Sequence, residues 1–292
     1  MGVARPALTA RAFLYTPAGA LRAPWRIVAF LTATAGCAVL AAALLTPFRP
    51  RLAALGIPGL GGWLVTLAAV LGGTAIALRW VDRRSWRDVW LDRSAAQPRR
   101  IAEGSALGLL AIGVPSAALM ARGWLSLERD APGSWLGAAI RVSVLLLVAA
   151  LAEELIFRGY VLAVLREKLG WAVAVALTSV AFGYAHAGNP GATARAVTLV
   201  MLAGVFLGTV VAVTRSLYAA WMAHFAWNWV MAVLLHIPVS GGELETPDYR
   251  TVDAGPDWAT GGAWGPEGGA AGAIGMIGGL GYLAVRHRRG TL

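Results

Sequence analysis

Long runs of apolar residues are the feature that most constrains how this chain can fold. Leu, Ala, Val and Gly recur in stretches of about 18 or more residues, the length a helix needs to cross a hydrocarbon core of about 30 Å. Of the residues, 58% are hydrophobic and only 14% are charged, whereas about a quarter are charged in a typical water-soluble domain. The sequence therefore predicts an all-α fold, a polytopic transmembrane helical bundle in a cell membrane.

About eight transmembrane spans are predicted, with both termini in the cytoplasm. The orientation follows from the arginines, which concentrate in the segments that would face the cytoplasm, as the positive-inside rule requires. An even number of spans is needed to place both termini on one side. The expected spans are residues 25–47, 61–79, 102–121, 136–165, 171–187, 193–213, 217–236 and 268–285.

The net charge of +10 comes almost wholly from arginine. These arginines lie in short loops between apolar spans, so we expect them to orient the protein in the membrane, and we expect no nucleic-acid partner. Cys37 is the single cysteine and lies within an apolar run, which leaves no disulfide framework and no cysteine-based metal site. The first span is too long for a cleavable signal peptide and is expected to be a signal anchor, with Arg5, Arg11, Arg22 and Arg26 as its positive flank.

A loop rich in glycine and acidic residues follows the seventh span, over residues 238–269. This composition predicts a flexible outer loop. A metal-binding role is a weaker alternative, because the acids show no regular ligand spacing. The acids are Glu243, Glu245, Asp248, Asp253, Asp257 and Glu267.

Two adjacent acids, Glu153 and Glu154, lie deep in the fourth predicted span. A charged group at the bilayer centre costs about 2.5–3.5 kcal/mol on insertion scales, so two adjacent charged groups there indicate a functional role. Arg158 follows Glu154 by four residues and shares its helix face, so the two can neutralise each other. A buried ion pair that only holds helices together explains Glu154 and Arg158 equally well. It does not explain Glu153, which points about 100° away around the helix.

Two histidines lie in other apolar spans and are candidates to meet Glu153. His186 closes the fifth span, and His224 lies inside the seventh, one helical turn before Asn228. A lone histidine in a membrane helix is more often a hydrogen-bonded contact between helices than a catalyst. Two histidines, an amide and a spare carboxylate on three spans instead indicate a site, because intramembrane ionisable groups face each other or a wet cavity.

Glu153 and His186 are expected at the same depth in the membrane, whereas His224 and Asn228 are expected at a different depth. Counted from the turn near Gly170, Glu153 and His186 both lie about 16 residues, or about 24 Å, along their helices. They can therefore face each other at one level. His224 and Asn228 start from a later turn and climb only about 13–20 Å, a difference that helix tilt would have to close.

Three ordered motifs carry a family resemblance: Glu153-Glu154-x-x-x-Arg158, Phe182-x-x-x-His186 and His224-x-x-x-Asn228. They resemble the signature motifs of the CPBP family, which comprises CAAX prenyl endopeptidases and bacteriocin-processing or immunity proteins. The similarity spans about residues 140–235 and includes Phe157-Arg158-Gly159-Tyr160 and Thr214-Arg215-Ser216-Leu217.

The resemblance implies an intramembrane glutamate-type endopeptidase. By position, Glu153 would be the general base that deprotonates water, assisted by His186. His224 and Asn228 would donate hydrogen bonds to the oxyanion, and Glu154 and Arg158 would order the site. Burial increases the affinity of a carboxylate for protons, and preorganised donors in a water-poor cavity stabilise developing negative charge.

Three alternatives stay open. Glu153, His186 and His224 form the ligand set of a catalytic zinc site, although the His-Glu-x-x-His spacing is missing, and we therefore expect no cofactor. A non-proteolytic immunity or membrane scaffold protein would use the same groups for binding or structure. A proton-coupled transporter would use Glu153 and His186 as a relay, but the sequence has no internal repeat.

These observations divide the chain into four parts. Residues 1–24 form a cytoplasmic basic flank and 25–130 the N-terminal transmembrane helices. Residues 131–236 form the catalytic CPBP-like core, and 237–292 the outer loop, last span and basic tail. The expected partners are the lipid bilayer and a membrane-associated peptide or protein substrate. The Ala, Gly and Arg bias suggests a high-GC bacterium, and so a bacterial plasma membrane.

Overall fold

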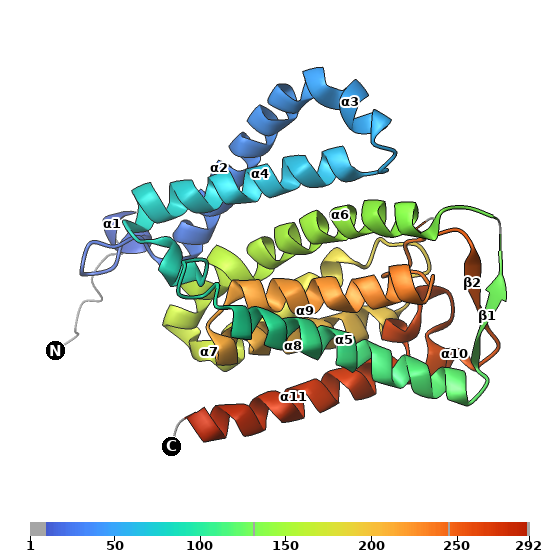
Figure 1. Ribbon diagram of the computed structural model, residues 1–292. Coiled ribbons are helices and arrows are strands. Elements are labelled where there is room, and N and C mark those ends of the chain that lie inside the picture. Colours follow the sequence, from blue (N-terminus) through green and yellow to red (C-terminus); the bar gives the residue numbers. More distant parts are fainter. Residues whose placement is uncertain (1–9, 131, 245, 291–292) are drawn as a thin grey trace.

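The computed structural model describes residues 10–130, 132–244 and 246–290. It is a bundle of long helices with one short two-stranded sheet at one end (Figure 1). The predicted helical bundle is confirmed, whereas the sheet was not expected. Arg5 of the predicted basic flank and Glu245 of the predicted outer loop lie outside the described residues.

Helices occupy all of the predicted spans over most of their length. The short helices are α1 (Ala10–Leu14), α3 (Arg49–Ala54) and α10 (Asp257–Thr260). The long helices are α2 (Ala23–Leu45), α4 (Leu60–Ile76), α5 (Pro98–Ala121), α6 (Trp135–Glu154), α7 (Tyr160–Ala185), α8 (Ala194–Thr214), α9 (Leu217–Trp229) and α11 (Ala270–Gly290).

Within the described chain, 5 helical stretches are long and apolar enough to cross a membrane. One of them, Trp135–Ala185, runs over 51 residues and contains both the fourth and the fifth predicted spans. The chain is therefore a multi-pass membrane protein. The count of eight spans and the cytoplasmic location of both termini stay predictions. Helix α1 and the last turn of α11 do lie at the same end of the bundle, as that prediction requires (Figure 1).

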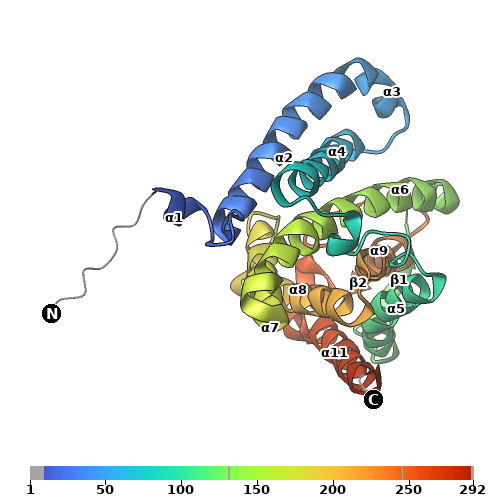
Figure 2. The same cartoon turned by 90° about the vertical axis from the view of Figure 1, so that its left-hand side faces the viewer.

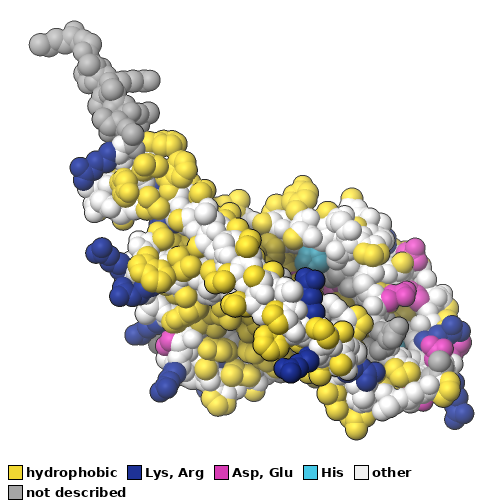
Figure 3. All heavy atoms as spheres, turned by 90° about the horizontal axis from the view of Figure 1, so that it is seen from above, with side chains coloured by type: hydrophobic (Ala, Val, Ile, Leu, Met, Phe, Trp, Pro, Cys, Tyr) yellow, Lys and Arg dark blue, Asp and Glu magenta, His cyan; other side chains and the backbone are white. Residues whose placement is uncertain are grey.

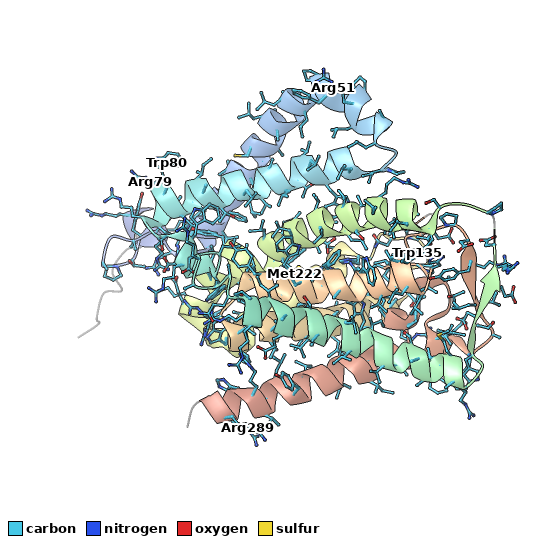
Figure 4. The ribbon with its side chains drawn as sticks, in the orientation of Figure 1. Arg51, Arg79, Trp80, Trp135, Met222 and Arg289 are labelled. Carbon is cyan, nitrogen blue, oxygen red and sulfur yellow. The ribbon has the colours of Figure 1, made fainter. Side chains whose placement is uncertain are left out.

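The surface agrees with a bundle that crosses a bilayer. Hydrophobic side chains spread over much of the face in Figure 3, between an arginine-rich left edge and a right edge that carries both signs of charge. Arg79, Trp80 and Arg289 lie at the end where α11 finishes, and Trp135 lies toward the opposite end (Figure 4). Aromatic and basic side chains are enriched at such membrane boundaries.

The stretch from 135 to 185 is not one straight helix. Gly170 has φ 76° and ψ 173°, a conformation that only glycine adopts at low cost, and α7 turns there. Farther upstream, α6 ends at Glu154 and passes into a π-helical segment, Leu155–Gly159. The fourth span therefore changes its helical geometry directly after Glu154, and π-helical turns of this kind often accompany functional sites.

Helix α9 lies within the core, with α5, α6 and α8 around it (Figure 2). Two glycines let α5 approach α9 closely. A β-carbon on Gly104 would lie 2.0 Å from the carbonyl oxygen of Ala219, and one on Gly108 would lie 2.0 Å from that of Ala223. Small residues allow such backbone contacts between membrane helices, and here they fix the helix that carries His224.

Replacing Gly108 by Val is expected to lower the free energy of unfolding by about 1–3 kcal/mol, because the neighbouring carbonyl belongs to backbone that cannot move aside. Thermal unfolding of the detergent-solubilised protein measures this loss. Gly113→Val on the same helix is the matched control, since a β-carbon there meets nothing within 4 Å. Equal destabilisation by both variants would contradict the close-packing explanation.

The segment after the seventh predicted span is folded, so the prediction of a flexible loop is wrong. Its strand β2 (Tyr249–Asp253) pairs antiparallel with β1 (Leu125–Arg129), and Leu127 lies opposite Thr251. The strands lie at the end of the bundle opposite α1 (Figure 1). Tertiary pairing with a distant segment, which composition alone does not reveal, orders this region.

Glycines in this segment allow its backbone to lie close to neighbouring backbone. Gly241 has φ 75°, and a β-carbon there would lie 2.0 Å from the carbonyl oxygen of Pro190. Trp264 is buried and packs beside Phe182 at the end of α7. The segment therefore closes one end of the core and brings Glu267 into the interior, where that residue is 7% exposed.

Candidate active site

Glu153 meets two histidines that come from two other parts of the chain. Its Oε2 lies 3.9 Å from Nε2 of His186 and 3.8 Å from Nε2 of His224. Glu153 lies in the last turn of α6, His186 directly follows α7, and His224 lies in the middle of α9. The same Glu153 oxygen is buried and has no hydrogen-bond partner among the described residues. The fold thus gathers a carboxylate and two imidazoles into one cluster.

Glu154 is bound on two sides. Arg158 Nη1 donates to its Oε1 at 2.9 Å, and His224 Nδ1 lies 2.9 Å from the same oxygen. Glu154 and Arg158 are both fully buried. The ion pair therefore neutralises a buried charge, and the same carboxylate oxygen contacts the His224 ring.

The hydrogen bonds identify the ring nitrogen that carries the proton in each neutral histidine. His186 Nδ1 lies 2.8 Å from the carbonyl oxygen of Phe182, which can only accept, so Nδ1 carries the hydrogen. His224 Nδ1 donates to the Glu154 carboxylate for the same reason. Each neutral ring then presents the lone pair of Nε2 toward Glu153. Three atoms able to accept a proton converge on one point.

Phe182 and Arg158 pack against this cluster. The guanidinium carbon of Arg158 lies 4.1 Å from the centre of the Phe182 ring, a favourable cation–π contact. The same ring lies 4.7 Å from the His186 ring and 5.9 Å from the His224 ring, both edge-on. The charged and aromatic side chains of the first two motifs are thus packed into one unit.

The earlier difference in depth between His224 and Glu153 does not keep them apart. The estimate assumed straight α-helices, but the chain between Glu153 and Gly170 includes the π-helical segment Leu155–Gly159. In the folded chain Nε2 of His224 lies 3.8 Å from Oε2 of Glu153. The two motif helices therefore bring these polar side chains to one level.

Asn228 lies with the histidines along a small cavity. His186, His224 and Asn228 line it together, and its volume is about 30 Å³. Such a volume holds one or two waters, since a water needs roughly 10–15 Å³ of this kind of space. Glu153 is not among the described lining residues and reaches the same histidines at their Nε2 atoms.

Glu267 also lines this cavity, and the sequence analysis did not single it out. Trp227 Nε1 donates to its Oε2 at 3.0 Å, while the backbone N–H and the hydroxyl of Ser240 donate to its Oε1 at 2.5 and 2.8 Å. Glu267 precedes the last helix and has no regular spacing to other polar residues, so nothing in the sequence separated it from the other acids of its segment.

Replacing Glu267 by Ala is expected to loosen the segment 237–269 by about 2 kcal/mol or more, because the buried donors of Trp227 and Ser240 lose a charged acceptor. Faster limited proteolysis within that segment is the measurement. Glu243→Ala, at an exposed position of the same segment, is the control. Unchanged proteolysis of the Glu267 variant would refute the anchoring role.

The Glu153 cluster is wider than a tetrahedral zinc site. The ligand atoms of a tetrahedral zinc site lie about 3.3–3.4 Å apart, as metal–ligand bonds of about 2.0–2.1 Å require. The separations of 3.8 and 3.9 Å at Glu153 are wider. Among the described residues, no group of three or more His, Cys, Asp or Glu side chains has a metal-binding arrangement. The donor chemistry suits zinc, whereas the spacing does not fit it.

The segment that carries this site matches a known protein family. Residues 135–230 match the family described as type II CAAX prenyl endopeptidase Rce1-like. The match starts at the first residue of α6 and ends directly after α9, so it contains Glu153, His186 and His224. No curated protein matches the chain significantly. The resemblance to CAAX-type CPBP proteins is thereby confirmed for residues 135–230, which are similar to the Rce1-like family of type II CAAX prenyl endopeptidases, a family of proteases.

Proposed function

We propose that this chain is an intramembrane endopeptidase that uses activated water to hydrolyse peptide bonds of membrane-associated or lipidated peptides and proteins. The observation that carries this proposal is the approach of Glu153 Oε2 to Nε2 of both His186 and His224, at 3.9 and 3.8 Å. A multi-pass protein of the bacterial plasma membrane would meet such substrates in the bilayer, without a nucleic-acid partner.

Glu153 is the proposed general base. A water near its Oε2 and His186 Nε2 would lie within hydrogen-bond reach of both acceptors, since each such bond spans about 2.8 Å. As the water oxygen forms a bond to the scissile carbonyl carbon, its proton passes to Glu153 and the carbonyl electron pair moves to oxygen. Collapse of this tetrahedral intermediate breaks the carbon–nitrogen bond, and the proton held by Glu153 passes to the leaving amine.

His224 and Asn228 are the proposed donors to the oxyanion. They lie one turn apart on α9 and line the same cavity. Asn228 donates through its amide, and His224 donates through Nε2 once that nitrogen is protonated. Donors held in place before the reaction stabilise developing negative charge strongly in a site that excludes water.

Glu154 and Arg158 act on the reaction through His224. The bond from His224 Nδ1 to Glu154 Oε1 fixes the ring orientation and favours positive charge on the ring when Nε2 is protonated. Arg158 compensates the Glu154 charge in a fully buried position. Both are therefore positioning residues, and the proposed step needs no cofactor.

A peptide substrate cannot enter the cavity as it stands, because about 30 Å³ accommodates water but not a polypeptide segment. The proposal therefore requires the surrounding helices to part when substrate binds. The Glu267 anchor closes one side of the cavity, so movement there would widen it.

The test is reconstitution of the purified protein in vesicles with a library of membrane-anchored peptides, read by mass spectrometry with and without a zinc chelator. We expect cleavage that persists in the chelator. Cleavage abolished by the chelator and restored by added zinc would overturn the metal-free mechanism. A folded wild type that cuts no library member, with or without added zinc, would favour a binding or immunity role.

A further inference from the structure

A basic cavity of about 720 Å³ lies at the end of the bundle where α5 begins and α11 finishes (Figure 4). It is separate from the Glu153 cluster, and apart from Ala212, Val213 and Arg215 its described lining residues lie outside the family-matched segment 135–230. The arginines that line it come from the start of α5, the turn after α8 and the last turns of α11. They are Arg99, Arg100, Arg215, Arg286 and Arg289.

The charge at this cavity is poorly compensated. None of its described lining residues is acidic. Within the described chain, the one ion pair made by these five arginines joins Arg286 Nε to Glu103 Oε1 at 2.6 Å. The α5 helix begins at Pro98, so the positive end of its dipole adds to the field at the same place. This combination favours binding of a phosphate group.

An apolar groove of about 650 Å³ continues from the basic cavity between α5 and α11. The two cavities share Arg99, Tyr282 and Arg286, so one leads into the other. The groove is lined on α5 by aliphatic side chains such as Leu110 and Val114. It follows two helices that lie side by side along the bundle (Figure 1).

Glycines on α11 shape this groove in two ways. A β-carbon on Gly275 would lie 1.6 Å from the carbonyl oxygen of Ala111, so this glycine allows α11 to touch α5. A β-carbon on Gly278 would meet nothing within 4 Å, so this glycine leaves the groove open. The opening has the volume and the apolar lining to take an acyl chain, with the arginines at its head.

We propose that the basic cavity and the α5–α11 groove together bind one anionic phospholipid, with its phosphate at the arginines and an acyl chain along the groove. Basic pockets between transmembrane helices on the cytoplasmic side recognise such headgroups. Charge complementarity selects an anionic lipid over a zwitterionic one, and the attached groove selects a lipid over a free phosphate.

Native mass spectrometry of the full-length protein in detergent tests this site, with phosphatidylglycerol and phosphatidylcholine of identical acyl chains as probes. We expect tighter retention of phosphatidylglycerol. Arg99→Gln/Arg289→Gln should weaken its binding about thirty-fold, as expected when two arginines near a headgroup are lost. Arg49→Gln/Arg51→Gln, which removes the same charge from the α3 region, is the matched control and should bind as the wild type does.

The groove has its own pair of variants. Gly278→Leu should fill the groove and weaken binding of phosphatidylglycerol, whereas Gly281→Leu on the same helix also meets open space but does not line the groove and should leave binding unchanged. Equal retention of both lipids, full binding by Arg99→Gln/Arg289→Gln, or full binding by Gly278→Leu would each overturn the site. Competition by inorganic phosphate as strong as that by phosphatidylglycerol would also overturn it.

Discussion

Glu153→Gln is expected to lower kcat for peptide cleavage by about 10²–10⁴-fold, the range lost when a general base is removed. Gln has nearly the same shape as Glu but cannot take a proton from water. The buried Oε2 of Glu153 has no hydrogen-bond partner among the described residues, so the exchange should disturb packing little. Initial rates on the peptide identified from the library measure the effect, with thermal unfolding as the check on folding.

Glu128→Gln provides the matched control. Glu128 lies in β1 at the surface and pairs with Arg250 at 3.5 Å, with about half of its side chain exposed. Such a pair contributes little to stability, so this variant should cleave at the wild-type rate. A Glu153→Gln protein that keeps more than about a tenth of the wild-type rate would contradict a role as general base.

Arg158→Met is expected to lower the free energy of unfolding by about 3–5 kcal/mol, the cost of leaving one partner of a buried ion pair uncompensated. Arg158 and Glu154 are both fully buried, so water cannot replace the lost charge. Denaturation of the detergent-solubilised protein, followed by tryptophan fluorescence, gives the change. Cleavage should fall as well, because His224 would then be held by a carboxylate without its cation.

The double variant Glu154→Gln/Arg158→Met separates stability from positioning. With both charges removed, no buried charge is left unpaired, and most of the stability should return. Cleavage should stay low, because the neutral amide supports a protonated His224 ring less well than a carboxylate does. Recovery of full activity together with stability would show that the pair has only a structural role.

The helices were predictable because the lengths of the apolar runs match the width of a bilayer. The contact between Glu154 and Arg158 was predictable because residues four apart lie on the same face of a helix. Glu154 and Arg158 are four residues apart and form the expected pair. Glu153, one residue away, points elsewhere and meets His186. A period of 3.6 residues per turn predicts the pair and the separate direction of Glu153, and counting residues from the turn near Gly170 predicts that His186 lies at the level of Glu153.

Contacts between distant segments could not be predicted in this way. Arg26 was assigned to the positive flank of the first span. In the fold it is 7% exposed and binds Asp82 at 2.5 Å and Glu167 at 2.7 Å. Tyr160 donates to the same Asp82 at 2.8 Å, so this network ties α2 to the start of α7. Neither charge counting nor periodicity reveals partners separated by many residues along the chain.

The position of Glu267 in the site could not be predicted from the sequence for the same reason. Its carboxylate enters the cavity because β1 and β2 pair and because Trp264 packs against the end of α7. A glycine-rich, acidic composition is typical of mobile loops, yet here the glycines allow backbones to touch. Composition describes a segment in isolation, whereas its order comes from what it contacts.

The most direct test of the central claim is a single turnover of the wild-type enzyme in water enriched in oxygen-18, on the peptide identified from the library. Activated water predicts one oxygen-18 atom in the new carboxyl terminus of the product and none in the enzyme peptide that contains Glu153. Label in the Glu153 side chain, or a product without label, would show that this carboxylate attacks the carbonyl itself and would contradict the account.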